Sequence, residues 1–285
     1  MYEQQNINHK LRILVVLLVL FTLILAACSP SALPETGSDS TELAFEFNDT
    51  EIAAPEDIQS GYATINGTNT GESPRLLMLA RLNSDVTPEQ FMQSFQENPD
   101  SAAELVTLIG GSSAPPGGSV QFTVNLQEGT HAAVGFSQSD APPTMSVFEV
   151  SAGEETGSPP QADAQVALVD FSFEFPEAIQ PGEQTWEVTN TGSQWHELYL
   201  VKLEPGVTEE DLMNMIMSEE EQQGPPPWQD VATYGPLSEG ETTWVTVDLE
   251  PGEYTAICFL PDLSGSGQPH VMLGMIESFT VGGDQ

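Results

Sequence analysis

The fold is decided by the stretch GEQTWEVTNTGSQWHELYLVKLEPGVTEEDLM (182–213), which repeats an earlier one, GYATINGTNTGESPRLLMLARLNSDVTPEQFM (61–92). The two stretches align without gaps at an offset of 121 residues, and the tripeptide Asn-Thr-Gly falls at the same place in both. Self-similarity over such a distance is typical of a duplicated structural unit. The sequence therefore predicts two similar domains in tandem.

Both copies have the pattern of several strands and one helix. Apolar and polar residues alternate in 185–190, and Asn-Thr-Gly and Pro-Gly sequences mark turns between such segments. Thr87 with Gln90, and Thr208 with Asp211, have the spacing of a capping box or its near relative at a helix N-terminus. We therefore predict an all-β fold of two tandem Greek-key β-sandwiches, each with one short inserted helix.

The N-terminus has the pattern of an export signal. Lys10 and Arg12 precede an uncharged, mostly apolar run, 13–27, which is shorter than the roughly 20 residues of a membrane-spanning helix. The run ends in Leu-Ala-Ala-Cys, which resembles the bacterial lipobox and implies that Cys28 is acylated as the first mature residue. We expect a bacterial, extracytoplasmic protein that is lipid-anchored to the cell membrane; the alternative is an uncleaved anchor.

Composition changes suggest where one segment ends and the next begins. Residues 153–164 are rich in Gly, Glu, Ser and Pro, as linkers are. The predicted division is a lipoprotein signal peptide (1–27), an acidic, Ser-rich stalk (28–42), a domain without metal ligands (43–152), a linker (153–164) and a domain with a candidate metal site (165–283).

The chain is strongly acidic. It has 43 acidic and 5 basic residues, of which one acidic and two basic residues lie in the predicted leader. The mature chain would therefore carry a charge of about −39, with histidine counted as neutral. Such a surface repels nucleic acid, which we exclude as a partner, and it suits a salty or acidic medium or a cationic partner.

Four side chains that bind soft metal ions occur where the second copy departs from the first. His196 falls opposite Arg75, and Cys258 falls opposite a glycine. The first copy has no residue corresponding to His270 and no clear counterpart of Met275. An unpaired thiol is unusual in an exported protein, which favours a metal-binding role for these residues in the second domain.

The order of these residues resembles that of the cupredoxins, the plastocyanin-like and azurin-like blue copper proteins. In that family a first histidine comes from one loop, and a cysteine, a second histidine and a methionine come from the loop before the last strand. The resemblance implies that His196, Cys258, His270 and Met275 bind one copper ion. A thiolate and two imidazoles with a distant thioether suit both Cu(I) and Cu(II), so electron transfer requires little rearrangement.

One feature departs from the family pattern. Eleven residues separate Cys258 from His270, whereas small cupredoxins have only a few there. The insert contains turn-forming residues at both ends, so that the chain can return His270 to the thiol. Met272 lies too close in sequence to His270 to be a good axial ligand, which leaves Met275 as the candidate.

Other interpretations need no metal. Cys258 at the end of an apolar strand could be a small buried hydrophobic residue. Met213, Met215 and Met217 lie two residues apart on a predicted helix, so their sulfurs cannot converge and core packing is the better interpretation. His131 falls opposite a tyrosine of the second copy and is predicted to be a surface residue of a strand.

The residue inventory argues against catalysis. Copper nitrite reductases and multicopper oxidases resemble this layout but need more histidines than the three of the mature chain, and no Gly-x-Ser-x-Gly motif is present. We therefore expect an electron carrier rather than an enzyme, exchanging electrons with another exported redox protein. The alternatives are a copper capture or delivery protein and a metal-free structural or adhesion module.

Overall fold

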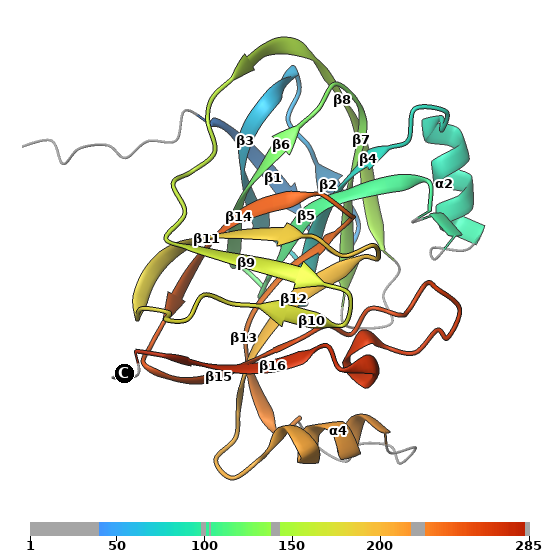
Figure 1. Cartoon of the computed structure of the whole chain (residues 1–285). Helices are drawn as coiled ribbons and strands as arrows, with labels where there is room; N and C mark the ends of the chain where they lie inside the picture. The colour runs from blue at the N-terminus through green and yellow to red at the C-terminus, as the bar shows by residue number, and fades with distance from the viewer. Residues whose placement is uncertain (1–39, 98–100, 103, 138–142, 218–225, 283–285) are drawn as a thin grey trace, which may run out of the picture. The chain divides into compact units, whose positions relative to one another are not determined.

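The computed structural model describes residues 40–97, 101–102, 104–137, 143–217 and 226–282. Strands account for most of this part of the chain, which confirms the all-β class (Figure 1). Helices with described bounds are α2 (Pro88–Glu97), α4 (Glu209–Met217) and the 3₁₀-helix η1 (His270–Leu273). The strands are β1 (Thr41–Phe47), β2 (Ile52–Ala53), β3 (Ile58–Asn69), β4 (Arg75–Leu82), β5 (Val106–Ala114), β6 (Ser119–Leu126), β7 (Gly129–Ser137), β8 (Thr144–Thr156), β9 (Ala164–Val169), β10 (Ser172–Glu174), β11 (Gly182–Asn190), β12 (His196–Leu203), β13 (Trp228–Leu237), β14 (Thr242–Leu249), β15 (Gly252–Ile257) and β16 (Ile276–Val281).

The order and pairing of the elements recur along the chain. Strand β4 pairs antiparallel with β5 and β7, and β12 pairs antiparallel with β13 and β15. Helix α2 connects β4 to β5, and α4 connects β12 to β13 (Figure 1). The predicted domain boundaries stay a prediction, and β8 continues to Thr156, within the predicted linker 153–164.

The two copies are joined by strand pairing. Strand β5 pairs with β13 and β6 pairs with β14, so that the strands of the described residues form one continuous hydrogen-bonded order. The Thr243 hydroxyl also donates to the Thr123 carbonyl at 3.0 Å, a buried bond across the β6–β14 pair. Residues from both copies, such as Phe122 and Trp186, belong to the same cluster of buried apolar side chains.

Successive side chains of a strand point to opposite faces, and this alternation decides which residues enter the core. In β11, Trp186 and Val188 are buried while the residues between and beside them are half-buried, as the period of two requires. Strand β12 supplies Leu198 and Leu200, which are fully buried. The strand that begins at His196 is thus held by a packed core along most of its length.

The helix signals of the sequence are confirmed. Thr87 N donates to Gln90 Oε1 at 2.8 Å and Gln90 N donates to Thr87 Oγ1 at 3.3 Å, which is a reciprocal capping box. Thr208 and Asp211 make the equivalent pair of bonds at the start of α4.

The face that α4 turns inward is apolar, as predicted. Leu212 is fully buried, and Met213 and Met215 are half-buried against the same cluster. Met217 is 59% exposed, so the three sulfurs of the Met-x-Met-x-Met sequence do not share one environment.

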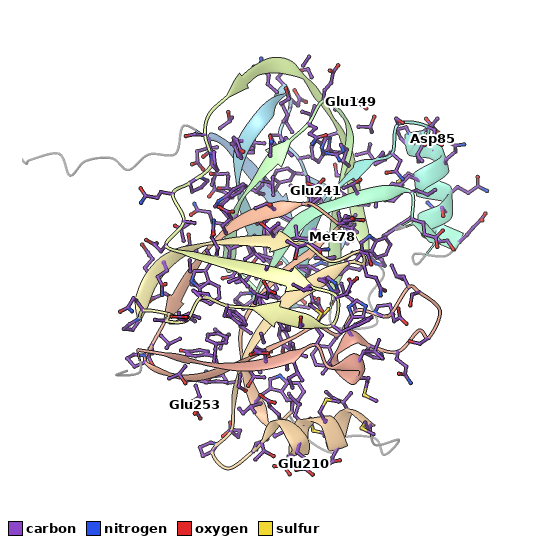
Figure 2. The ribbon with its side chains drawn as sticks, viewed as in Figure 1. Met78, Asp85, Glu149, Glu210, Glu241 and Glu253 are labelled. Atoms are coloured by element: carbon purple, nitrogen blue, oxygen red, sulfur yellow. The ribbon has the colours of Figure 1, made fainter. Side chains whose placement is uncertain are left out.

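The acidic residues lie largely outside the core. Asp85, Glu149, Glu210 and Glu253 are exposed and project outward from the ribbon (Figure 2). In the part of the chain that the structure describes, no helix is long and apolar enough to span a bilayer. The predicted signal peptide, the stalk up to residue 39 and the lipidation site Cys28 lie outside the described residues.

Candidate metal centre

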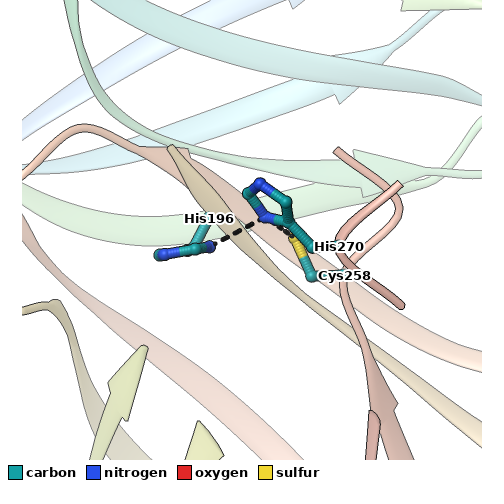
Figure 3. Close-up of side chains that lie close together, drawn as sticks. All are labelled: His196, Cys258 and His270. Atoms are coloured by element: carbon teal, nitrogen blue, oxygen red, sulfur yellow. Dashed lines mark hydrogen bonds between the residues drawn. The ribbon is translucent and has the colours of Figure 1, made fainter. Parts of the chain in front are cut away.

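Three of the four predicted ligands converge on one point. His196 Nδ1 lies 3.1 Å from His270 Nδ1, and Cys258 Sγ lies 3.4 Å from the same His270 nitrogen (Figure 3). One donor atom from each of the three residues lies within 4.8 Å of the other two. All three side chains are fully buried. Residues that are 74 positions apart in the sequence thus form a compact, dry cluster of soft donors.

The strand register brings the first histidine to the cysteine. Strands β12 and β15 run antiparallel with Tyr199 opposite Ile257. His196 begins β12 and Cys258 directly follows β15, so both lie at the same end of this strand pair. Two side chains fixed by neighbouring strands keep their separation without help from a ligand.

The long excursion after Cys258 returns to the thiol. Pro261 and Pro269 form an antiparallel bridge that closes the insert. Next to it, His270 N donates to the Leu260 carbonyl at 2.8 Å. The eleven intervening residues therefore do not separate His270 from Cys258, because the chain returns at the base of the loop.

Asp262 organises the interior of this loop. Its carboxylate accepts hydrogen bonds from Ser264 N at 2.9 Å and Ser266 N at 3.2 Å. Hydrogen bonds from the two serines hold the pKa of Asp262 well below its usual range. Leu263 N donates to Gln194 Oε1 at 2.7 Å, which attaches the loop to the segment that precedes His196.

Met275, the fourth predicted ligand, is buried beside the cluster. Its carbonyl accepts from Cys258 N at 3.2 Å, and its own N–H donates to the His270 carbonyl at 3.0 Å. Met272, by contrast, packs half-buried in a different apolar cluster that includes Leu212. The role of Met275 as an axial ligand stays a prediction.

Asp170 orients the first histidine and was not among the site residues predicted from the sequence. His196 Nε2 lies 3.0 Å from Asp170 Oδ1, and Ser193 donates to the same carboxylate through N at 2.9 Å and Oγ at 2.6 Å. Burial acts to raise the pKa of Asp170, but the hydrogen bonds from Ser193 and His196 outweigh it and lower this pKa to about 2. An ionised acceptor at Nε2 keeps the proton there and aims the Nδ1 lone pair at the centre.

Both histidines are neutral at pH 7. Burial lowers the pKa of His196, although Asp170 opposes this effect. Burial and the nearby His196 lower the pKa of His270 to about 4. Neutral imidazole is the form that binds metal ions, and two lone-pair nitrogens 3.1 Å apart repel unless a proton or a cation lies near them.

His270 is enclosed by an aromatic residue. Phe171 adopts φ 64°, in the left-handed region that is uncommon for a residue other than glycine, and its ring lies edge-on to His270 at 5.2 Å. His270 Nε2 is buried and has no hydrogen-bond partner among the described residues. The site is thus shielded from water on this side.

The thiol is protonated when no cation is present. Burial, followed by the charge of Glu197, raises the pKa of Cys258 to about 12. Glu197 is itself held in place by a hydrogen bond from Phe259 N at 3.0 Å. A soft metal ion would displace the thiol proton and gain a thiolate ligand between two neutral imidazoles. The donor set therefore fits a mononuclear site for copper or a similar ion.

In the first copy a guanidinium stands where the second copy has these ligands. Arg75, at the position of His196, is buried and contacts Asp49 Oδ1 at 3.1 Å through Nη1. Its Nη2 donates at 3.0 Å to the carbonyl of Gly135, the residue opposite Cys258 in the repeat. A fixed positive charge thus balances the carboxylate here, and no imidazole or thiol is present at these two positions.

The prediction that His131 is a surface residue is wrong. Its side chain is fully buried, stacks on Phe148 at 5.7 Å and places Nδ1 3.1 Å from the Gly129 carbonyl. Burial lowers the pKa of His131 to about 4. The physical reason is that β7 lies between β4 and β8 with apolar side chains covering both of its faces, so that no position in its centre reaches water.

Comparisons with known proteins find similar chains only among solved structures. No family model and no curated protein matches the sequence. Auracyanin from Roseiflexus castenholzii is 16% identical, with a TM-score of 0.28, over 40% of this chain and 99% of that one. Blue copper oxidase from Nitrosomonas europaea is 12% identical, with a TM-score of 0.25, over 85% of each chain. At such low identities and TM-scores, neither the ligands nor the activities of those proteins can be assigned to this chain.

The comparisons correct the expectation that the chain is not an enzyme. Similar structures include a multicopper oxidase and the copper-containing nitrite reductase of Thermus scotoductus, both of which are enzymes. The nitrite reductase is 14% identical, with a TM-score of 0.23, over 87% of this chain and 69% of that one.

Proposed function

We propose that the chain binds one copper ion and transfers single electrons through it. The observation that carries this proposal is the convergence of His196, Cys258 and His270, whose donor atoms lie within 4.8 Å of one another in a fully buried cluster. Met275 is buried and its backbone is hydrogen-bonded to those of Cys258 and His270; it is the proposed axial ligand.

The residues of the chain would hold the ion in a fixed environment. Copper alternates between Cu(I) and Cu(II), and a His₂Cys set with a weak thioether suits both states. Asp170 holds the ring of His196, and the closed loop around Asp262 holds His270. Because these supports do not depend on the ion, the ligand geometry would change little between oxidation states.

Localisation and partner belong to the same proposal. The apolar leader and the lipobox-like ending at Cys28 support a lipid-anchored protein outside the cytoplasm. The partner would be another exported redox protein. Electrostatic complementarity to the 42 acidic residues left after removal of the leader (43 minus Glu3) favours a partner with a cationic docking face.

The test is copper loading of the full chain, followed by absorption and metal analysis. We expect one copper per chain and an intense thiolate-to-copper band at about 600 nm, typical of a His₂Cys site. Cys258→Ser should abolish the band, whereas Cys28→Ser, which leaves the site untouched, should retain it. A colourless copper-loaded protein would favour storage or delivery instead, and a chain that binds no copper would refute the proposal.

A further inference from the structure

We propose that Tyr199, together with Asp230 and Trp228, is a one-electron relay between the surface and Cys258. The inference rests on the proposed function, because it gives the candidate metal centre a route to the outside. It concerns residues of this chain that do not bind the ion. They lie on β12 and at the start of β13.

The inner end of the relay begins next to the thiol. Phe259 directly follows Cys258 in the chain, and its ring centroid lies 5.8 Å from that of Tyr199. Both rings are half-buried and belong to the apolar cluster that also includes Trp228. One peptide unit and one aromatic contact therefore connect Cys258 to Tyr199.

The outer end is a cluster of three hydrogen-bonded side chains. The Tyr199 hydroxyl donates to Asp230 Oδ1. Trp228 Nε1 lies 3.2 Å from the Tyr199 oxygen and 3.1 Å from Asp230 Oδ1. Asp230 is exposed and Trp228 is half-buried, so an electron acceptor or donor at the surface can approach them closely.

The acceptor of the phenol proton distinguishes Tyr199 from other tyrosines. Tyr234 and Tyr254 donate to the backbone carbonyls of Thr246 and Glu250, which are not bases. The Tyr199 hydroxyl, unlike these two, donates to a carboxylate, that of Asp230. Burial, and then the bond to Asp230, raises the pKa of Tyr199, so the phenol is protonated at neutral pH.

The electron and proton balance of the relay is closed. A metal-centred one-electron oxidant at the surface takes one electron from the Tyr199–Trp228 pair, and the oxidation state of its metal falls by one. The phenol O–H bond breaks and its proton passes to the Asp230 carboxylate, which leaves a neutral tyrosyl radical. One electron then arrives from the Cys258 side and the proton returns, so that no net proton is lost.

The first experiment uses the metal-free full chain. A photo-generated ruthenium(III) tris-bipyridine oxidant, freeze-quenching and electron paramagnetic resonance should give a tyrosyl signal. We expect this signal to fall severalfold in Tyr199→Phe and in Asp230→Asn, whose amide cannot accept the proton. Tyr62→Phe is the matched control, because Tyr62 also neighbours a tryptophan, Trp244, at 5.5 Å, and should leave the signal unchanged.

The second experiment uses the copper-loaded, reduced full chain and measures radical lifetime by flash photolysis. We expect a shorter lifetime than in the metal-free chain, and Phe259→Leu should lengthen it severalfold while the absorption band of the oxidised site persists. Circular dichroism checks that each variant is folded.

The outcomes separate the two proposals. Failure to bind copper would overturn the proposed function, and the relay with it. A coloured copper site would leave the function standing, but the relay would be overturned by a tyrosyl signal that survives in Tyr199→Phe. A lifetime that Phe259→Leu does not alter would also overturn the relay alone.

Discussion

Two aspartates at equivalent positions of the repeat accept hydrogen bonds from different side chains. Asp170 accepts from the imidazole of His196, and Asp49 accepts from the guanidinium of Arg75. In both copies the next turn also donates to the carboxylate, through Ser193 N and Glu72 N respectively. The carboxylate and its loop thus belong to the shared scaffold, and the residue opposite it decides whether the copy has an internal cation or a ligand for one.

The first prediction concerns the Asp170→Asn variant. The amide oxygen accepts the hydrogen bond from the His196 Nε2–H more weakly than a carboxylate does, so His196 loses its fixed tautomer and orientation. Loss of such an outer partner lowers metal affinity by about 10–100-fold. A competition titration against a copper chelator measures the change. Asp49→Asn, the same substitution in the other copy, is the control and should leave the affinity as it is; equal affinities for all three proteins would contradict the role of Asp170.

The second prediction concerns pH and His131. The pKa of this buried imidazole is about 4 in the folded chain, below its ordinary value of 6.5. The unfolded chain therefore binds more protons, and the free energy of unfolding should decrease as pH falls from about 6.5 towards 4. Urea denaturation at a series of pH values measures this decrease.

The matched variant for this test is His131→Tyr. Tyrosine is the residue of the second copy at this position, where Tyr254 stacks on Phe279 at 5.7 Å as His131 stacks on Phe148. The variant removes the titrating ring and should flatten the decrease relative to the wild type. An identical pH dependence in both proteins would show that other groups, such as carboxylates, account for all of it.

At the scale of elements, the loop between β15 and η1 decides whether the site exists. Its turn-forming residues indicate an excursion, but turn chemistry does not fix where the second end returns. The return depends on the Pro261–Pro269 bridge, on Asp262 and on the contact of Leu263 with Gln194, which lies far away in the sequence. Such side-chain contacts are set by the assembled sheet.

The third prediction tests this loop. Asp262→Ala removes the acceptor for Ser264 N and Ser266 N and should let His270 move away from the thiol. A loss of about 1.4 kcal/mol, comparable to one net hydrogen bond, corresponds to about tenfold weaker copper binding. Leu263→Ala is the control, because this side chain is 50% exposed and its backbone bond to Gln194 is retained. Wild-type affinity in Asp262→Ala would show that the loop is held by other contacts.

The elements differ in how far the sequence could predict them. The strands, the capping pairs such as Thr87–Gln90 and the order of the candidate ligands follow from local residue types and from the repeat. The contact of Asp170 with His196 could not be predicted in this way, because it depends on the parallel pairing of β9 with β11. The burial of His131 was mispredicted because a strand covered on both faces has no outward positions.

At the scale of the whole described chain, the two copies share their sheets. The pairs β5–β13 and β6–β14 cover strand edges that each copy would otherwise expose, and one buried cluster draws residues from both copies. Arg81 and Glu241 add an ion pair at 3.4 Å between the copies. Pairing between edge strands has no local sequence signal, so a prediction of two domains joined by a linker could not anticipate it.

The last prediction follows from this shared core. We expect one cooperative unfolding transition for the chain rather than two. The four tryptophans all lie in 165–283, and two of them, Trp195 and Trp244, contact side chains of the first copy. Their fluorescence therefore reports the second copy and its joint with the first, whereas circular dichroism reports strands of both. The two signals should therefore give the same urea midpoint. Copper at about a hundred times its dissociation constant should add about 2.7 kcal/mol to the free energy of unfolding and shift both signals together.

Thr243→Val tests the joint between the copies directly. It removes the buried hydrogen bond to the Thr123 carbonyl and should lower the free energy of unfolding by about 1 kcal/mol in both signals at once. Thr242→Val is the control, since its hydroxyl bonds to Thr189 within the second copy and not across the joint. If circular dichroism instead showed a second transition that neither copper nor Thr243→Val moves, the first copy would be unfolding independently and the shared core would not couple the two.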